Sequence, residues 1–214
     1  MKTHLIEIVA VDPTSNQLAS QFKELASLLA AAYVPVELEF ARKNHTALDK
    51  DKFLNILQPY FQDGLDRVAW DVVEAKLNAI LKQFFAEGFL KGLSANSDIC
   101  ANNTHYLAIA RDSANNAPLG ALYGWMNNTG PEKNFRVPIF GVAPKAQGEG
   151  IGKALLSSLF ENIPSLQKVH LSTRATNEKA LSLYHHLGFT LLPSTLENWV
   201  NLEYSANGRG SLES

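Results

Sequence analysis

Residues 142–156 read Val-Ala-Pro-Lys-Ala-Gln-Gly-Glu-Gly-Ile-Gly-Lys-Ala-Leu-Leu. The apolar run over 137–142 predicts a strand, and a helical pattern of apolar residues begins at Ile151. The glycines between them can adopt positive φ angles and leave room for a ligand beside the backbone. A strand that turns through glycines into a helix presents backbone N–H groups and the positive end of the helix dipole. This segment therefore predicts an anion site, for which phosphate is the usual ligand.

Two common phosphate-binding motifs do not fit this segment. A P-loop needs a glycine where Gln147 stands, and a Ser or Thr after Lys153, where alanine follows. The dinucleotide pattern G-x-G-x-x-G fails because Lys153 or Leu155 falls at the place of its third glycine. The pattern that remains is Gln147-x-x-Gly150-x-Gly152. Taken alone, it fits a phosphate loop and a simple flexible connection equally well.

A second motif begins 25 residues after Gly152. Residues 177–189 read Asn-Glu-Lys-Ala-Leu-Ser-Leu-Tyr-His-His-Leu-Gly-Phe, and the separation leaves room for one helix and one strand. The two segments, in this order, resemble the signatures of the GNAT family of N-acetyltransferases. The first is similar to the acetyl-CoA pyrophosphate loop Q/R-x-x-G-x-G/A, and the second to N-x-x-A-x-x-[LF]-Y-x-x-x-G-F. The resemblance covers about residues 104–204, and the N-terminal half fits by length and pattern.

Length and composition predict one catalytic domain. The 214 residues, 46% of them hydrophobic, can bury one substantial core without disulfides. We expect residues 1–206 to form a single GNAT-like domain and residues 207–214 to be a disordered tail. The net charge of −2, with scattered basic residues, argues against nucleic acid as a partner.

Cysteine and histidine usage argues against a metal. Cys100 is the only cysteine, which rules out an intrachain disulfide and a multi-cysteine zinc site and suits a reducing compartment. His185 and His186 are neighbours on a predicted helix and therefore point apart.

Residues 1–11 lack a cleavable signal pattern, since Glu7 interrupts the apolar run. We expect a soluble, cytoplasmic protein with no metal and no membrane partner, and we leave homodimer formation open.

The periodicity of apolar residues predicts alternating strands and helices. Asp12 and Pro13 predict the start of a helix that stops before Pro35. Residues 36–64 predict a loop with a short helix near 47–57. The other expected helices are 65–90, 150–163 and 177–187, and the expected strands are 5–11, 105–110, 119–125, 135–142, 168–173, 189–192 and 199–204.

The GNAT resemblance implies an α/β fold of the α+β kind, with a mixed, mostly antiparallel sheet and helices on both faces. In that family two adjacent parallel strands splay apart, and the pantetheine arm of CoA enters the gap. Here those strands would be 137–142 and 168–173.

The same resemblance implies an acyl-CoA-dependent N-acyltransferase, which transfers acetyl from acetyl-CoA directly to an amine of a small molecule or peptide. A thioester is already an activated acyl donor, so the enzyme mainly positions it and stabilises the oxyanion. No nucleophilic residue and no cofactor besides the co-substrate acetyl-CoA are required. By resemblance, the pyrophosphate is held by the backbone amides of Gln147, Gly148, Glu149, Gly150, Ile151, Gly152 and Lys153.

Further roles also come from the resemblance. Main-chain groups of Phe140 and Val142 are expected to pair with the pantetheine, the amide near Val142 to polarise the thioester carbonyl, and Asn177 to contact the CoA arm. Tyr184 occupies the position that the family uses beside the thioester sulfur. Full proton transfer from a tyrosine (pKa ~10) to a thiolate (~8.5) is uphill by roughly 2 kcal/mol. We therefore expect a hydrogen bond to the departing sulfur, with a core position for Tyr184 as the alternative.

A general base is not evident, because strand 135–142 contains no carboxylate. His170, on a strand beside the expected gap, has a suitable ordinary pKa near ~6.5 and is the candidate catalytic base, with a structural histidine as the alternative. His105 and Glu132 are weaker candidates.

The acceptor cannot be read from the sequence. In GNAT proteins its site is built from the segment between the first two helices and from the last strand pair, here 33–64 and 193–199. These segments contain the acidic and aromatic residues Glu37, Glu39, Asp49, Asp51, Asp63, Glu197, Tyr60, Phe61 and Trp199. They fit a site for a cationic amine and also an ordinary solvated surface. A non-catalytic CoA-binding sensor or structural protein, and a phosphate-binding protein without CoA, remain as alternative functions.

Overall fold

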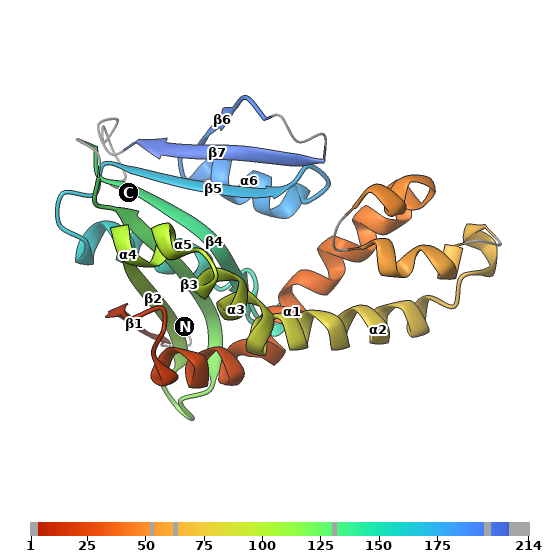
Figure 1. Cartoon of the computed structure of the whole chain (residues 1–214), viewed down its shortest axis with the longest axis horizontal. Coiled ribbons are helices and arrows are strands. Elements are labelled where there is room, and N and C mark those ends of the chain that lie inside the picture. The colour runs from red at the N-terminus through yellow and green to blue at the C-terminus, as the bar shows by residue number, and fades with distance from the viewer. Residues whose placement is uncertain (1–3, 52–53, 62–63, 130–131, 195–197, 206–214) are drawn as a thin grey trace.

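The computed structural model describes residues 4–51, 54–61, 64–129, 132–194 and 198–205. Its centre is a seven-stranded sheet with the order β1-β2-β3-β4-β5-β7-β6 (Figure 1). The strands are β1 (His4–Val11), β2 (Asn103–Asp112), β3 (Pro118–Asn127), β4 (Asn134–Val142), β5 (Lys168–Arg174), β6 (Thr190–Leu192) and β7 (Trp199–Ser205). β4 and β5 pair in parallel, and the other neighbouring strands pair antiparallel. The predicted mixed, mostly antiparallel sheet is confirmed.

Asp63, Glu197 and the predicted tail 207–214 lie outside the described residues, as does the side chain of Asp49.

Helices cover both faces of the sheet. They are α1 (Asn16–Asn44), α2 (Trp70–Gln83), α3 (Phe89–Ser94), α4 (Ser97–Asn102), α5 (Ile151–Asn162) and α6 (Glu178–His186). Along β2, Leu107 and Ile109 pack into the core with α1 and α2, whereas Ala108 and Ala110 pack into the core with α5. This alternation follows from the pleat, which directs successive side chains to opposite faces.

The parallel pair of strands opens part of the way along its length. β4 and β5 are paired from Asn134 with Lys168 to Val137 with Leu171. Within these two fully described strands the pairing ends there, although β4 continues to Val142. The next residue of β4 is Pro138, which has no N–H to contribute to a ladder. The splayed strand pair expected from the sequence is thereby confirmed, and a proline stands where it begins.

A β-bulge lies at the same place on the other edge of β4. Ile139 pairs with Tyr123 of β3, but Arg136 pairs with Trp125, so β4 has one residue more than β3 between these pairs. The bulge moves Ile139 into the core beneath α1 and returns Phe140 to the side of α5 and α6. Gly124 faces the bulge, where an added Cβ would clash with the Arg136 carbonyl oxygen.

Helix α1 corrects two expectations. Its N-cap is Ser15, which accepts a hydrogen bond from the Leu18 N–H, whereas Asp12 accepts from Thr14 in the turn before the helix. The helix also runs past Pro35 to Asn44, so the predicted stop was wrong.

The reason lies in the residues that α1 buries beyond the proline. A proline inside a helix costs about 3 kcal/mol. Leu38 and Phe40 are buried after it, and such side chains contribute roughly 1.5–3 kcal/mol each. Pro35 itself faces solvent. The burial of Leu38 and Phe40 therefore outweighs the local cost of the proline.

The predicted helix 65–90 and the predicted loop 36–64 also differ from the structure. A 3-10 turn (Leu65–Arg67), α2, a π-helical turn (Phe84–Gly88) and α3 replace the single helix, and helical backbone continues past Gly88. Two 3-10 segments, His45–Lys50 and Asn55–Phe61, lie between α1 and α2. The second half of α1, these segments and α2 form a helical arm that extends away from the sheet (Figure 1).

Candidate active site

The glycine loop has the backbone conformation that its sequence predicts. Gly148 and Gly150 have φ angles of +83° and +80°, and an added Cβ at either position would meet nothing within 4 Å. Gly150 is the N-cap of α5 and supplies no side-chain cap, and the first turn contains no acidic residue. The first N–H groups of α5 are therefore suited to an anionic ligand. Gly152 differs, because its Cβ would lie 3.3 Å from Leu183 of α6, so it serves close packing.

The main chain of β4 presents polar groups to the opening. The Ala143 N–H donates to Leu119 of β3 at 2.8 Å. Successive N–H groups of a strand alternate in direction. Those of Phe140 and Val142 therefore point away from β3, towards the side of β4 on which β5 no longer pairs. Two contacts agree with this direction. The Phe140 N–H donates to the Tyr33 hydroxyl at 3.3 Å, and Gln147 Nε2 donates to the Val142 carbonyl at 3.2 Å.

Tyr184 lies in the core beside this opening. It is buried, and its ring lies 6.3 Å from that of Phe140 and 5.5 Å from that of Phe189. Burial raises the pKa of Tyr184, and the neighbouring Tyr33 raises it further. Its hydroxyl therefore stays protonated and can only act as a hydrogen-bond donor to a developing thiolate.

Asn177 begins α6. Its side-chain oxygen accepts from the Ala180 N–H at 3.3 Å, and its Nδ2 donates to Thr173 Oγ1 of β5 at 3.0 Å. These two bonds cap α6 and connect it to β5, which explains structurally why an asparagine occupies the first position of the second motif.

The candidate bases lie away from the opening. His170 faces Arg136, four residues before Phe140, which corresponds to about 13 Å along a strand. Its Nε2 lies 3.5 Å from Glu203, and burial lowers its pKa although Glu203 opposes this. Glu132 forms an ion pair with Lys168 at 3.1 Å.

His105 is a core residue. Its Nε2 lies 3.1 Å from the Ile99 carbonyl, which can only accept, so Nε2 carries the proton. Nδ1 then accepts from the Tyr123 hydroxyl at 2.8 Å. Both ring nitrogens are occupied, and burial lowers the pKa of the ring.

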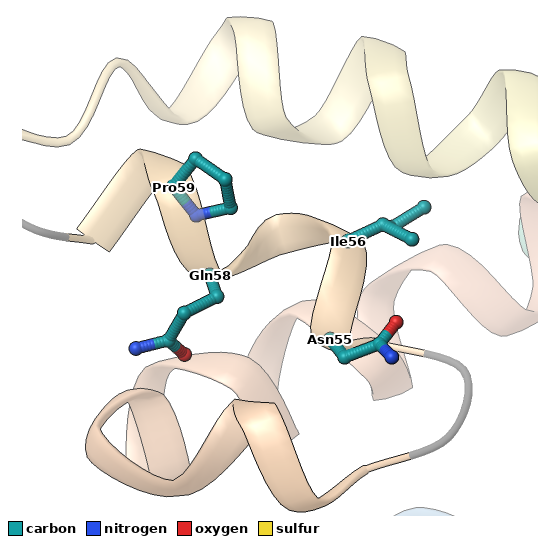
Figure 2. Close-up of a pocket in the computed structure, with 4 residues that line it drawn as sticks. All are labelled: Asn55, Ile56, Gln58 and Pro59. Carbon is teal, nitrogen blue, oxygen red and sulfur yellow. The ribbon is translucent and has the colours of Figure 1, made fainter.

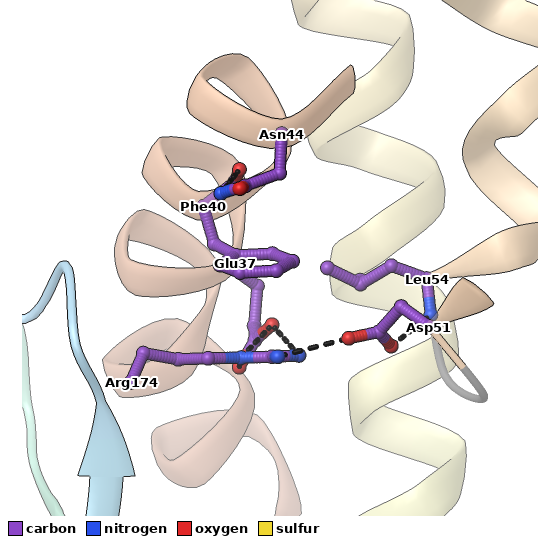
Figure 3. Close-up of polar contacts among 6 residues, drawn as sticks. All are labelled: Glu37, Phe40, Asn44, Asp51, Leu54 and Arg174. Atoms are coloured by element: carbon purple, nitrogen blue, oxygen red, sulfur yellow. Dashed lines mark hydrogen bonds and ion pairs between the residues drawn. The ribbon is translucent and has the colours of Figure 1, made fainter. Parts of the chain in front are cut away.

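A buried ion cluster lies at the far end of the opening (Figure 3). Arg174 lies three residues beyond the last β4–β5 pair, as does Phe140 on the other strand. Its guanidinium bonds both oxygens of Glu37 and, at 2.8 Å, Asp51 Oδ2. It also lies between the rings of Phe40 and Trp199, at 4.0 and 4.4 Å from their centroids. Burial raises the pKa of Glu37, and the bonds from Arg174 oppose the rise.

Tyr33 and Arg174 were not identified from the sequence, and Glu37 was named only as an acidic residue. A usable signal exists in helical spacing, because Leu29, Tyr33 and Glu37 follow each other at four-residue intervals on one face of α1. Ending the predicted helix before Pro35 removed Glu37 from that face.

Two surface hollows lie elsewhere. A shallow hollow of about 510 Å³ is lined by Asn55, Ile56, Gln58 and Pro59 on the helical arm (Figure 2). A second, of about 290 Å³, opens beside Pro35 between α1 and α2. Neither includes the glycine loop or β4. We place the site by its main chain instead, because an extended ligand can bind strand edges by backbone hydrogen bonds.

Two features are absent from the described residues. Among them, no group of three or more His, Cys, Asp or Glu side chains is arranged to hold a metal ion. No helix in that part of the chain is both long and apolar enough to cross a membrane.

Comparison with known proteins agrees with this geometry. A model of the acetyltransferase (GNAT) family matches residues 75–189, slightly more than half of the chain. A stretch of 56 residues is 48% identical to mycothiol acetyltransferase from Pseudarthrobacter chlorophenolicus, but covers 25% of this chain and only 17% of that protein.

Solved structures share the fold. An acetyltransferase from Thermus thermophilus is 13% identical with a TM-score of 0.50, covering 96% of this chain and 99% of that one. The PaiA N-acetyltransferase from Thermoplasma acidophilum, solved with coenzyme A, is 12% identical with a TM-score of 0.53, covering 94% and 99%. At these identities the likeness concerns the fold alone. The family match and the sheet that splays after Val137 lead to one conclusion: the chain belongs to the GNAT family of acetyltransferases.

Proposed function

We propose that this protein is an acyl-CoA-dependent N-acyltransferase that transfers acetyl from acetyl-CoA to an amine, within a single domain over residues 1–206. The observation that carries the proposal is the continuity between the opening and the glycine loop. The gap-facing main chain of Phe140 and Val142 leads directly, along β4, to the uncapped start of α5. A ligand with an extended polar arm and a phosphate end fits this arrangement.

Three parts of acetyl-CoA then have a partner. The pyrophosphate would bind the amides of residues 147–153, and the pantetheine would pair with Phe140 and Val142. The thioester carbonyl would accept from the Phe140 N–H, the first gap-facing amide after the pairing ends at Val137. This differs from the expectation of an amide near Val142. The start of α6 at Asn177 would lie along the CoA arm.

The reaction needs little more than this placement. The neutral amine attacks the thioester carbon, and the oxyanion is stabilised by the amide. The Tyr184 hydroxyl, protonated because of burial, would donate a hydrogen bond to the departing sulfur. His170 lies too far along β5 for direct proton transfer, so we propose that the ammonium proton leaves through solvent.

The charges at the far end of the opening favour an amine as acceptor. With Glu37 and Asp51 both ionised, their cluster with Arg174 carries one net negative charge. A cationic amine is attracted by such a field, whereas an anionic acceptor is repelled. Small-molecule amines and peptide N-termini both satisfy this condition.

Two measurements test the proposal. Calorimetry with acetyl-CoA measures binding, and release of the CoA thiol measures transfer across polyamines, aminoglycosides, amino acids and peptide N-termini. Amine-dependent thiol release is expected. Binding without release for every amine class would favour a non-catalytic CoA-binding protein instead, since β4 carries no carboxylate. Absence of binding would overturn both functions.

A further inference from the structure

Tyr33 of α1 reaches the main chain of β4 at the opening. Its ring packs edge-on against Phe85 of the π-helical turn, with 5.0 Å between centroids. Its hydroxyl accepts the Phe140 N–H at 3.3 Å. This reach depends on Gly141, where an added Cβ would lie 3.1 Å from Leu29 and 3.2 Å from Ala32 of the same helix. A glycine at this position lets α1 approach β4 closely enough for the contact.

The Tyr33 hydroxyl therefore occupies the position that we assign to the thioester carbonyl oxygen of acetyl-CoA. The Phe140 N–H is the amide to which we assign the thioester carbonyl, and it points to only one strong acceptor at a time. When a carbonyl oxygen takes this N–H, the hydroxyl oxygen has to move away. A displacement to oxygen–oxygen contact, about 2.7 Å, brings it within hydrogen-bond distance of that same carbonyl oxygen.

The protonation state sets the direction of the new bond. Burial raises the pKa of Tyr33 to about 12, so the phenol remains protonated at neutral pH. It can accept from the Phe140 N–H while the site is free of ligand and donate to a carbonyl oxygen when the site is filled.

We propose that Tyr33 is a catalytic residue whose hydroxyl, together with the Phe140 N–H, forms a two-donor oxyanion hole for the thioester carbonyl. This proposal rests on the acyl transfer proposed above. As the amine nitrogen bonds to the carbonyl carbon, the carbonyl π electrons move to the oxygen, which both donors stabilise. The carbonyl then re-forms, the carbon–sulfur bond breaks, and the thiolate gains a proton in place of the one that the amine loses to solvent.

The first test is kinetic and uses Tyr33→Phe, which keeps the ring against Phe85. Loss of one oxyanion donor predicts a decrease in kcat of about a hundredfold or more. The KM for acetyl-CoA should change by less than about threefold, because the second donor acts mainly in the transition state. Tyr123→Phe is the matched control, since it also removes one hydroxyl from the same core and one hydrogen bond, to His105. It should retain the wild-type kcat.

The second test needs no acceptor. Infrared spectra of acetyl-CoA labelled with carbon-13 at the thioester carbonyl report the hydrogen bonding of that carbonyl in the bound state. The stretch should move to higher frequency in Tyr33→Phe than in the wild type and remain in place in Tyr123→Phe.

Four outcomes are decisive. An unchanged carbonyl frequency in Tyr33→Phe overturns the proposal, and so does a wild-type kcat with a lowered KM, which would make the hydroxyl a mere competitor of the ligand. A shifted frequency in a protein that turns over no amine supports the role of Tyr33 while the proposed transfer fails. Absence of acetyl-CoA binding to the wild type overturns both.

Discussion

Arg174 and Glu37, 137 positions apart in the sequence, meet in a buried ion pair with 2.8 Å between Nη2 and Oε2. Glu37 belongs to α1, and Arg174 is the last residue of β5. The ion pair therefore connects the helical arm to the sheet. Removal of one partner leaves a charge without compensation in a dry environment, which costs more than the pair contributes.

Arg174→Met should therefore lower the free energy of unfolding by about 3–5 kcal/mol, because Glu37 remains buried without its partner. The double variant Arg174→Met/Glu37→Gln should recover part of this loss. Urea unfolding measures both. The exposed pair Lys43–Glu39 is the control, since Lys43→Ala should cost less than about 1 kcal/mol. A double variant less stable than Arg174→Met would contradict the argument.

Gly150→Asp should abolish acetyl-CoA binding, because it places a negative charge beside the expected pyrophosphate and a side chain at a φ of +80°. Gly64→Asp is the control outside the loop, and it is the more strained substitution, because Gly64 has a φ of +86° and a ψ of +163° whereas Gly150 has a ψ of 0°. Calorimetry should show binding to the Gly64 variant only. Equal affinity of both variants would refute the loop assignment.

Acetyl-CoA at a hundred times its Kd should raise the free energy of unfolding by about 2.7 kcal/mol, because it binds only the folded state. NAD and ATP should have little effect, since they lack the pantetheine that pairs with β4. Thermal unfolding with each ligand measures this. A larger shift with ATP than with acetyl-CoA would favour the phosphate-binding alternative.

Tyr184→Phe should lower kcat by roughly ten- to a thousandfold, the range for loss of one hydrogen bond that stabilises the departing thiolate. The KM for acetyl-CoA should change little, and stability should fall by no more than about 1 kcal/mol. Steady-state kinetics and urea unfolding measure these effects. A wild-type kcat would leave Tyr184 as a core aromatic packed against Phe140 and Phe189.

Stability should decrease as the pH falls below about 6.5, the ordinary histidine value, because burial lowers the pKa of His105 in the folded state. The unfolded chain then binds a proton that the folded one does not, which adds a slope of up to about 1.4 kcal/mol per pH unit. His105→Gln should show a shallower slope in urea unfolding between pH 7 and 5, and a parallel curve above pH 7.5. Equal slopes would mean that His105 is protonated in the fold.

The strands and the two helices after residue 100 could be predicted because their apolar periodicity and turn residues are local signals. The start of α5 was equally visible, since Gly148 and Gly150 are residues that adopt positive φ at little cost. The passage of α1 through Pro35 could not be, because burial of Leu38 and Phe40 against distant segments decides it. For the same reason the contact of Tyr33 with Phe140 depends on how α1 crosses the sheet, which no local pattern encodes.

The proline at the head of the opening also bears on association between chains. A strand edge whose N–H and carbonyl groups face outward is a template on which another polypeptide can add a strand, and proteins usually protect such edges. Pro138 creates an edge of this kind in the middle of the sheet rather than at its margin. The Tyr33 hydroxyl accepts from the Phe140 N–H, so this donor of the edge is not available to a foreign strand.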